Sequence, residues 1–298
     1  MAVARPLKLK AEVFRNRSLP SENTGLARVW VDSGVYHLDS EFDYAIPTSL
    51  DSVIKIGVRI VVPFGNRECE AIVLSRGVLK NQAGLKQIIK VVSAIPVATT
   101  ESLRLIAEVS KRWAAHPYDV LRSAIPPRSA AVDKETVVSE KWPAPSRKLV
   151  RKYLQFPPAQ DAYRLIADYV AARGSGGSVL VLLPDSRSIE RLQEFISNAI
   201  VLDSNLDKSE RYRNYLKTMR ERELVVLGTR SSVFAPLPDL VEIILVDDGS
   251  ESYYEQRSPG WNARDVAALR SELGSISLTL MGYSPSAEVA RLIEIGWI

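Results

Sequence analysis

The sequence predicts an α/β protein in which a small β-rich domain precedes a second domain built on a parallel sheet. Two patterns predict this order. In the first 75 residues, short apolar stretches lie between turn-forming residues, as antiparallel strands do. After residue 150, continuous β-branched stretches alternate with amphipathic stretches, which is typical of a parallel sheet covered by helices on both faces. The 298 residues are enough for two ordinary domains.

The amino-terminal part is expected to begin with a flexible basic arm, residues 1–25, because this stretch lacks a clear hydrophobic period and ends in turn-forming residues. Strands are expected at 27–34, where apolar and polar residues alternate, and at 57–65 and 69–75, which are short and apolar. The Pro and Gly between the last two predict a hairpin connection.

Two helical segments follow these strands. Residues 99–114 begin with capping hydroxyl residues and carry apolar side chains at helical spacing, and 117–127 form a short helical turn that stops at two prolines. We therefore place the β-rich domain at 26–127. Residues 128–150 are polar with scattered prolines and are expected to be a linker.

The second domain is expected over residues 151–298, where strands and helices alternate along the chain. The expected strands are 178–185, 199–203, 223–229, 242–248 and 276–282. The expected helices between and after them are 186–198, 207–223, 262–273 and 284–295.

Composition excludes several classes of protein. Cys69 is the only cysteine, which excludes a disulfide framework and a multi-cysteine zinc site. No apolar run reaches the roughly 18–20 residues of a membrane span, so no membrane partner is expected. The basic amino terminus is not followed by the apolar core of a secretory signal. We therefore expect a cytoplasmic protein.

The charge is spread unevenly. Residues 1–130 hold 18 Lys and Arg against 12 Asp and Glu, whereas residues 131–298 hold 21 against 23. A basic first half fits a polyanionic partner such as nucleic acid. An ordinary surface with extra lysine gives the same count, so charge alone leaves both interpretations open.

Short motifs along both domains stand in an order that resembles one family. In the first domain they are FDYAIP (42–47), GVRIVVPFG (57–65), LKQIIKVV (85–92) and HPYDVLRSAIP (116–126). In the second domain they are GTRSSVFAPLPDL (228–240), VDDGSESYYEQ (246–256), GWNARDVAALR (260–270) and MGYSPSAE (281–288). This order is similar to that of the primosomal protein N′ (PriA) replication restart family.

The resemblance implies that the second domain is a RecA-like lobe, the first of two in an ATP-dependent DNA helicase. Family members continue into a second lobe, a cysteine-rich zinc module and a C-terminal domain, which have no counterpart in this sequence. The winged-helix insert of the family also has no counterpart. We therefore expect a short form of the family with a degenerate helicase lobe, and neither ATP nor zinc as a cofactor.

The phosphate loop expected of such a lobe is altered. A phosphate cradle needs a glycine-rich loop with inward-facing amides, a Lys for the phosphates and a Ser or Thr for Mg²⁺. Aligned by the helix that follows residue 161, the lysine position falls on Ala159 and the hydroxyl position on Gln160. Pro157 and Pro158 stand where the loop needs glycine, and proline has no N–H to offer. We expect no phosphate loop here.

The acidic motif of the lobe is altered as well. Where the family has Asp-Glu-Glu-His, this sequence has Asp247, Asp248, Gly249 and Ser250. Asp247 retains the chemistry to hold a metal ion, whereas Asp248 is one methylene shorter than the glutamate that would reach an attacking water. Together with the altered loop, this predicts a degenerate nucleotide site and no ATPase or helicase activity.

A binding site for the 3′ end of DNA is implied by the resemblance in the first domain. The family residues fall on Phe42 and Asp43 of FDY, Gly65 of PFG and Lys86 of LK. Asp43 would accept a hydrogen bond from the terminal base or hydroxyl, and Phe42 would form an apolar wall. Gly65 would let the backbone approach closely, and Lys86 would attract phosphate. Without the resemblance, this stretch indicates only a strand that ends in a turn.

Two arginines of the second domain are candidates for DNA contact. Arg230 in GTRSS and Arg264 in NARD match lobe positions that serve either DNA contact or packing, and the sequence leaves both roles open. The basic residues of the arm would add non-specific phosphate contacts, or would only keep the arm solvated. They are Arg5, Lys8, Lys10, Arg15 and Arg17.

Three hypotheses about function follow. The first is a PriA-like replication restart factor that recognises forked or branched DNA, helps to assemble the primosome with the helicase loader, and works without helicase activity. The second is a minimal ATP-dependent 3′–5′ DNA helicase with a non-standard phosphate site. The third is a decayed relative without function. Against decay, the strand and helix patterns persist through the second domain.

Overall fold

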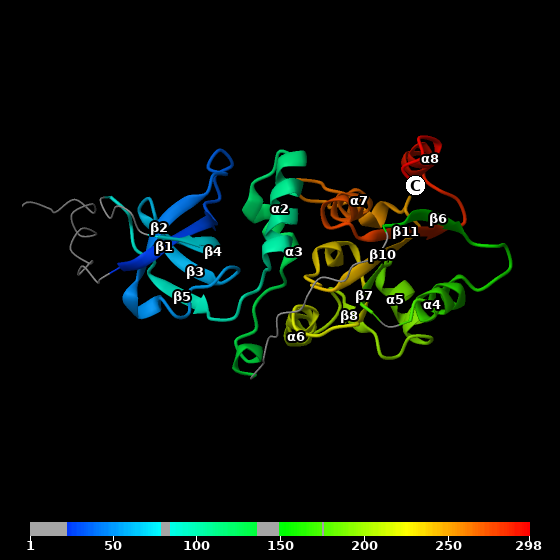
Figure 1. Cartoon of the computed structure of the whole chain (residues 1–298), viewed down its shortest axis with the longest axis horizontal. Helices are drawn as coiled ribbons and strands as arrows, with labels where there is room; N and C mark the ends of the chain where they lie inside the picture. The colour runs from blue at the N-terminus through cyan, green and yellow to red at the C-terminus, as the bar shows by residue number, and fades with distance from the viewer. Residues whose placement is uncertain (1–22, 79–83, 136–148, 175) are drawn as a thin grey trace, which may run out of the picture. The chain divides into compact units, whose positions relative to one another are not determined.

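The chain divides into two units, one ending at Val97 and the other beginning at Ala98. The computed structural model describes residues 23–78, 84–135, 149–174 and 176–298. Most of the expected arm and of the expected linker lie outside the described residues. Each unit is described by itself, and Figure 1 follows the chain through both.

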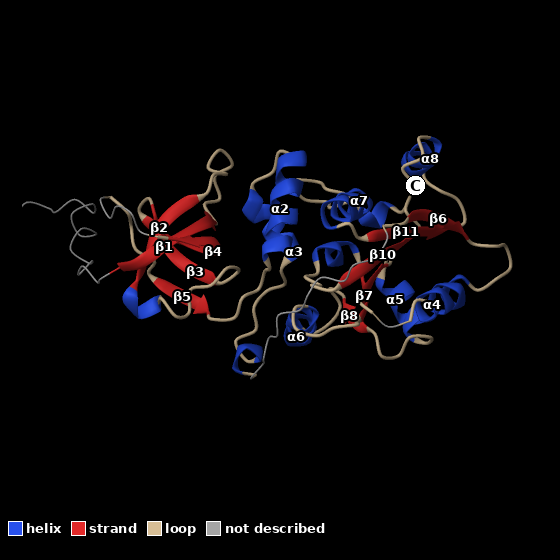
Figure 2. Ribbon diagram, in the orientation of Figure 1, coloured by secondary structure: helices blue, strands red, loops and turns tan. Residues whose placement is uncertain are grey.

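The first unit is a five-stranded antiparallel sheet, drawn in red in Figure 2. Its strands are β1 (Asn23–Val31), β2 (Phe42–Pro47), β3 (Arg59–Phe64), β4 (Arg67–Gly77) and β5 (Lys90–Ser93), arranged in the order β2-β1-β4-β3-β5. The short 3₁₀ helix η1 (Thr48–Leu50) follows β2. The predicted hairpin is the two-residue turn between Phe64 and Arg67, which pair across β3 and β4.

The sheet closes on itself because the chain leading into β5 pairs with both sides. Gln87 forms a parallel bridge with Ala45 of β2, and the amide of Ile89 donates to the carbonyl oxygen of Val61 in β3, at 2.9 Å. A small barrel results, and its alternate inward side chains form a fully apolar core. Tyr44 is part of this core and donates its hydroxyl hydrogen to the carbonyl of Pro63, at 3.1 Å.

The second unit is built on a six-stranded parallel sheet. Its strands are β6 (Arg151–Gln155), β7 (Ser178–Leu182), β8 (Ile200–Leu202), β9 (Val225–Gly228), β10 (Leu240–Val246) and β11 (Ser277–Gly282), arranged in the order β6-β11-β10-β7-β9-β8. Every residue of β7, β10 and β11 is buried, which explains why their sequences are mainly apolar. The predicted fold class, a β-rich domain followed by a parallel α/β domain, is confirmed.

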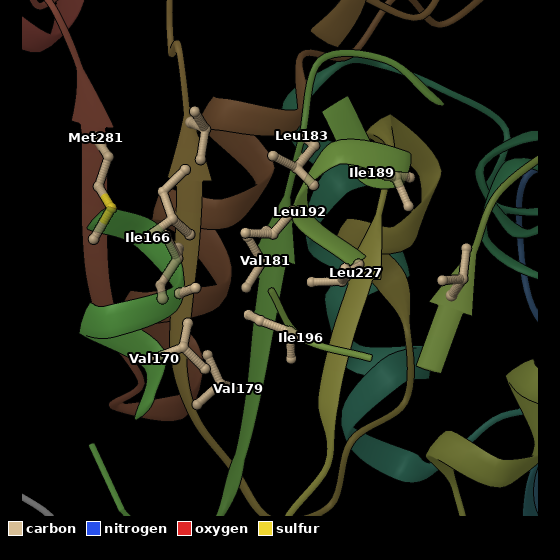
Figure 3. Close-up of a cluster of buried hydrophobic side chains, with 14 of the residues drawn as sticks. Ile166, Val170, Val179, Val181, Leu183, Ile189, Leu192, Ile196, Leu227 and Met281 are labelled. Atoms are coloured by element: carbon tan, nitrogen blue, oxygen red, sulfur yellow. The ribbon is translucent and has the colours of Figure 1, made fainter. Parts of the chain in front are cut away.

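Helices cover both faces of this sheet. The helices of the unit are α2 (Thr100–Arg112), α3 (Pro117–Ala124), α4 (Ala162–Ala172), α5 (Ser186–Gln193), α6 (Lys208–Thr218), α7 (Ala263–Gly274) and α8 (Ala287–Glu294). On one face, Ile166 of α4 and Leu192 of α5 pack against Val181 and Leu227 of the strands, as Figure 3 shows. On the other face lie α7 and the 3₁₀ helix η3 (Arg230–Phe234), and the short 3₁₀ helix η4 (Glu251–Tyr253) follows β10.

Helices α2 and α3 pack within the second unit. Helix α2 contacts α7, and α3 contacts η3. The sequence places both helices in the β-rich domain that ends at residue 127, whereas packing divides the chain after Val97. A further 3₁₀ helix, η2 (Val132–Lys134), lies where the linker was expected to begin. Strand β1 likewise begins at Asn23, inside the expected arm.

No helix in the described part of the chain combines the length and the apolar run that a bilayer crossing needs.

Gly228, at the end of β9, is expected to tolerate no side chain. An added Cβ would lie 2.1 Å from the Oγ of Ser232, and that hydroxyl donates to the carbonyl of Leu202 at 2.9 Å. Gly228→Ala therefore has to push η3 off the sheet, and we expect it to lower the free energy of unfolding by about 1–3 kcal/mol. Urea unfolding, with hydrogen exchange of the β7 and β9 amides, measures this in the second unit alone.

Gly249→Ala is the matched control, because its added Cβ would lie at an ordinary 3.5 Å from Ser286. A Gly228→Ala variant as stable as Gly249→Ala would show that η3 is not held tightly against the sheet.

Candidate functional site

One end of the barrel gathers three of the expected DNA-binding residues. Phe42 begins β2, Gly65 follows the end of β3, and Lys86 lies one residue before the bridge between Gln87 and β2. Since β3 runs opposite to β2 and the bridge to β2 is parallel, these positions all lie at the same end. We call this end, with Phe42, Phe64, Gly65 and Lys86, the barrel mouth.

Phe42 and Phe64 form the apolar wall of the barrel mouth. Their ring centroids are 5.0 Å apart and their planes meet at 83°, the edge-to-face geometry that aromatic pairs prefer. Both rings pack against the barrel core but are only partly buried. They therefore close the core from water while keeping apolar surface exposed.

Asp43 is held by an arginine that the sequence analysis did not single out. Arg28 lies directly opposite it on β1 and donates from Nε to Oδ1 at 2.9 Å and from Nη2 to Oδ2 at 3.3 Å. The hydrogen bond and the charge of Asp43 raise the pKa of the Arg28 guanidinium. Half of the Arg28 side chain remains exposed. The pairing depends on the register of β1 and β2, which no local sequence pattern reveals.

Gly65 and Lys86 are open to solvent. Gly65 has a φ of +58°, as the first residue of this tight hairpin turn requires, and no atom lies within 4 Å of where its Cβ would be. Lys86 is exposed, and its carbonyl accepts from the amide of Ala45 at 2.9 Å. The structure thus brings Phe42, Gly65 and Lys86 to one end. Asp43 lies beside Phe42 but projects from the opposite side of β2, toward Arg28.

A second candidate site lies at the carboxyl edge of the parallel sheet. Asp247 and Asp248 follow β10, where ligands of open α/β sheets usually bind. Asp247 is exposed and has a φ of +55°, which only a few residue types adopt readily. Asp248 is buried, and its Oδ2 accepts from the amide of Ser286 at 3.0 Å. Its Oδ1 has no hydrogen-bond partner among the described residues.

Electrostatic repulsion marks this edge. Although the Asp247 side chain reaches solvent, partial desolvation by the surrounding atoms, then the charge of Asp248 and then that of Asp185, raise the pKa of its carboxyl. Burial and the charges of Asp248 and Asp247 raise the pKa of Tyr153, on the edge strand β6, to about 12. Within the described ranges, no group of three or more His, Cys, Asp or Glu side chains has the arrangement to hold a metal ion.

The loop that carries Ala159 and Gln160 begins at the same edge, because it follows β6 and β6 runs parallel to β11. Ala159 has a φ of +67°, and the amide of Gln160 points back to the carbonyl of Pro157 at 3.5 Å. At the start of α4, Oδ1 of Asp161 accepts from the amides of Tyr163 and Arg164, at 2.9 and 3.4 Å. A carboxylate of the chain itself thus occupies the amino end of the helix.

Tyr253 fills the carboxyl ends of the two central strands. Its ring is completely buried, and its hydroxyl lies 2.7 Å from the carbonyl oxygen of Val246 and 3.0 Å from that of Leu182. These carbonyls end β10 and β7, where the order of the sheet reverses. In the sequence, Tyr253 stands out only as part of the motif at 246–256. Its contact with both strands requires β7 and β10 to be neighbours in the sheet.

Arg230 and Arg264 are both engaged within the second unit. Arg230 donates to the carbonyls of Ser252 and Tyr254, and its Nη2 lies 3.3 Å from Glu255. Arg264 is buried, and its guanidinium pairs with Asp265 and with Glu288 and donates to Ser286. This geometry fits the packing role that the sequence left open for both residues.

Comparison with known proteins finds a family match that includes most of the first unit. Residues 28–126 match the family model described as the PriA 3′ DNA-binding domain. A probable replication restart protein PriA of Mycobacterium tuberculosis (strain CDC 1551 / Oshkosh) is 31% identical over 293 residues, covering 88% of this chain and 45% of that protein. The replication restart protein PriA of Rickettsia felis is 25% identical over 279 residues, covering 85% and 42%. The chain spans a little under half the length of these relatives.

Solved structures align more weakly. The C-terminal domain of the DEAD-box protein Dbp5 aligns with a TM-score of 0.36 at 12% identity, covering 51% of this chain and 87% of that one. The Escherichia coli DExH-box NTPase HrpB aligns with a TM-score of 0.33 at 16% identity, covering 50% and 20%. The description of the parallel unit therefore rests on its own topology.

The fold and the matched family model define a protein that joins a 3′ DNA-binding domain to a parallel α/β unit. Over the part of those proteins that it spans, the chain is similar to replication restart proteins named PriA, and residues 28–126 match their 3′ DNA-binding domain.

Asp247→Asn is expected to stabilise the protein at neutral pH. The raised pKa means that ionising Asp247 costs stability, and this cost appears as pH rises through the folded-state pKa. Asn removes the charge and tolerates the positive φ. Because Asp247 is exposed, we expect a gain of only a few tenths of a kcal/mol, roughly, near pH 7, and none near pH 3. Urea unfolding at both pH values measures it.

Equal stability of the variant and the natural protein at both pH values would contradict the repulsion. Stabilisation of the natural protein by Mg²⁺, absent in the variant, would show that the carboxylates hold a metal ion.

Proposed function

We propose that this chain is a PriA-type replication restart factor that binds the 3′ end of a DNA strand at a fork and acts without hydrolysing ATP. The observation that carries the proposal is the match of residues 28–126 to a 3′ DNA-binding domain, with the expected contact residues at one end of the barrel. The partners would be forked or branched DNA, primosome proteins and the loader of the replicative helicase. The place of action would be the cytoplasm, where bacterial chromosomes lie.

The pair of Asp43 and Arg28 supports recognition of a free 3′-hydroxyl. A lone carboxylate would repel the phosphates of the strand, but Arg28 balances that charge at 2.9 Å. Each carboxylate oxygen has two acceptor sites, so the two bonds from Arg28 leave Asp43 able to accept from a hydroxyl. A 3′-phosphate offers no such donor at neutral pH and brings negative charge instead.

The barrel mouth supplies the other contacts that an end requires. The partly exposed rings of Phe42 and Phe64 offer a wall for the terminal sugar and base. Gly65 leaves its backbone accessible, and exposed Lys86 offers charge for the last phosphodiester. Phe42 and Asp43 come before Ala45 on β2, and Ala45 is the residue that forms the bridge to Gln87. A nucleotide bound along this part of the strand would reach side chains on both faces of β2.

Three features support action without ATP. Pro157 and Pro158 offer no N–H in the loop before α4. The carboxylate of Asp161 already accepts the helix amides that would otherwise face a phosphate, and it would repel one. Tyr253 fills the crevice between β7 and β10. ATP and Mg²⁺ do not fit these residues.

We expect forked DNA with a free leading-strand 3′-hydroxyl to bind more tightly than the same fork with a 3′-phosphate. A hydrogen bond to a charged acceptor is worth about 1.5–3 kcal/mol, so the preference should be roughly tenfold or more. Asp43→Ala should remove the preference. Fluorescence anisotropy with both forks, with and without ATP, measures it.

Asp51→Ala is the matched control for that experiment. Asp51 is also an exposed aspartate paired with an arginine, Arg76, but it follows η1 at the opposite end of the barrel. It should retain the full preference. Equal binding of the two forks by the natural protein, or an Asp43→Ala variant with undiminished preference, would refute end capture.

ATP with Mg²⁺ is expected to leave the melting temperature unchanged, because a ligand that does not bind the folded state cannot stabilise it. Fork DNA should likewise stimulate no phosphate release. Stabilisation by millimolar ATP, or phosphate release that depends on DNA, would favour the minimal helicase. Loss of that effect in Asp248→Ala would locate the nucleotide at the carboxyl edge of the sheet.

A further inference from the structure

The loop between β1 and β2 displays two ring side chains at its tip. The amide of Leu38 donates to the carbonyl of Val35 at 3.0 Å, which closes a β-turn with Tyr36 and His37 at its two corners. Both are exposed, and Tyr36 keeps 63% of its surface open to solvent. This is the largest exposed fraction of any described aromatic side chain in the protein.

Hydrogen bonds hold the residues that lead into this turn. Ser33 is completely buried, and its hydroxyl oxygen accepts from the amide of Val35 at 3.1 Å. The guanidinium of Arg67, at the start of β4, donates to the carbonyl of Ser33. The amide of Asp32 donates to the carbonyl of Glu70 in the same strand at 2.8 Å. The ring of Tyr36 is therefore carried by a loop that is bonded to β4 at Asp32 and Ser33.

The loop lies at the barrel mouth. It leaves the end of β1 and returns to the start of β2, where Phe42 stands. Its anchor Arg67 follows the turn that contains Gly65. Two separate aromatic surfaces thus occur at one end of the barrel. The rings of Phe42 and Phe64 already pack against each other, whereas that of Tyr36 has its surface open.

We propose that Tyr36 is a stacking platform for a base of single-stranded DNA a short distance before the captured 3′ end. This inference rests on the proposed function of the same site. Bases stack on exposed aromatic rings irrespective of sequence, because every base has a π-face. A ring held on an anchored turn offers that contact at a low cost in conformational entropy.

The acidic residues around the loop indicate which part of a DNA strand could contact Tyr36. Asp32, Asp39 and Glu41 surround the turn in sequence, and the last two are exposed. A phosphate backbone would be repelled there, so the strand has to meet the loop through an uncharged base. Its phosphates would run on the side of Lys86. The contribution of Tyr36 should therefore release no counterions and should not change with salt concentration.

The test compares Tyr36→Ala and Tyr36→Phe with the natural protein on forked DNA with a 3′-hydroxyl. Loss of one stacked base should weaken binding about 5- to 150-fold for Tyr36→Ala, by the same factor at low and high salt. Tyr36→Phe keeps the ring and should bind as the natural protein does. Tyr283→Ala, which removes a tyrosine 54% exposed on the second unit, is the control and should change nothing.

An abasic site placed in turn at each of the last four positions locates the stacked base. One position should weaken binding by the natural protein and leave Tyr36→Ala unaffected. The preference for a 3′-hydroxyl over a 3′-phosphate should survive in Tyr36→Ala, because Asp43 is intact.

Failure of the stacking and failure of end capture give different results. If the natural protein prefers the 3′-hydroxyl but Tyr36→Ala binds equally well, only the stacking is refuted. If Tyr36→Ala loses affinity only at low salt, the contact is electrostatic and the stacking is again refuted. If the natural protein shows no preference for the 3′-hydroxyl but Tyr36→Ala binds the fork more weakly at every salt concentration, stacking on Tyr36 is supported and end capture is refuted.

Discussion

The first unit depends on one short run of backbone hydrogen bonds. Residues 86–89 bond to β2 through Ala45 and to β3 through Val61, and these bonds turn an open sheet into a barrel. An open sheet would leave the first residues of β2 and the end of β3 far apart, because β1 and β4 lie between these two strands in the sheet. Closure brings Phe42 against Phe64 and sets Lys86 beside them. The candidate DNA-end site is therefore a product of closure, and the tight core of aliphatic side chains is what holds it.

The second unit is a parallel α/β sheet whose carboxyl edge is occupied by side chains of the chain itself. Polar groups at the carboxyl edge of a parallel sheet need partners, and a bound nucleotide commonly supplies them. Here Asp161 accepts from two amides of α4, and the Tyr253 hydroxyl, which has one hydrogen to donate, lies within hydrogen-bond distance of the last carbonyls of two central strands. The buried Oδ1 of Asp248 has no partner among the described residues. The same unit also packs α2 and α3 on its other elements, which is consistent with a structural role.

Local patterns predicted much of this fold, and long-range pairing decided the rest. Fully buried strands such as β7 and β10 are apolar apart from Ser178 and Glu242, so their sequence revealed both their position and the parallel sheet. Helix starts at Thr99 and Asn262 also carried capping residues. The partner of Asp43 was hidden, since Arg28 becomes its neighbour only through the register of β1 and β2. The position of Tyr253 at the ends of β7 and β10 could not be predicted from the sequence for the same reason, because it requires these two strands to be adjacent. The family resemblance identified the candidate residues, and the pairing of the β strands determines how their side chains are held.

The division of the chain after Val97 bears on how this protein exchanges parts during evolution. The region that matches the 3′ DNA-binding domain extends to residue 126 and so includes α2 and α3, which pack on α7 and η3. A recombination event that cut at residue 126 would separate those two helices from the elements that cover their apolar faces. A cut near residue 97 would leave both cores whole. Exchange of the barrel between related proteins therefore disrupts less packing at a boundary near residue 97 than at residue 126, where the family match ends. Natural fusions should accordingly be found near residue 97.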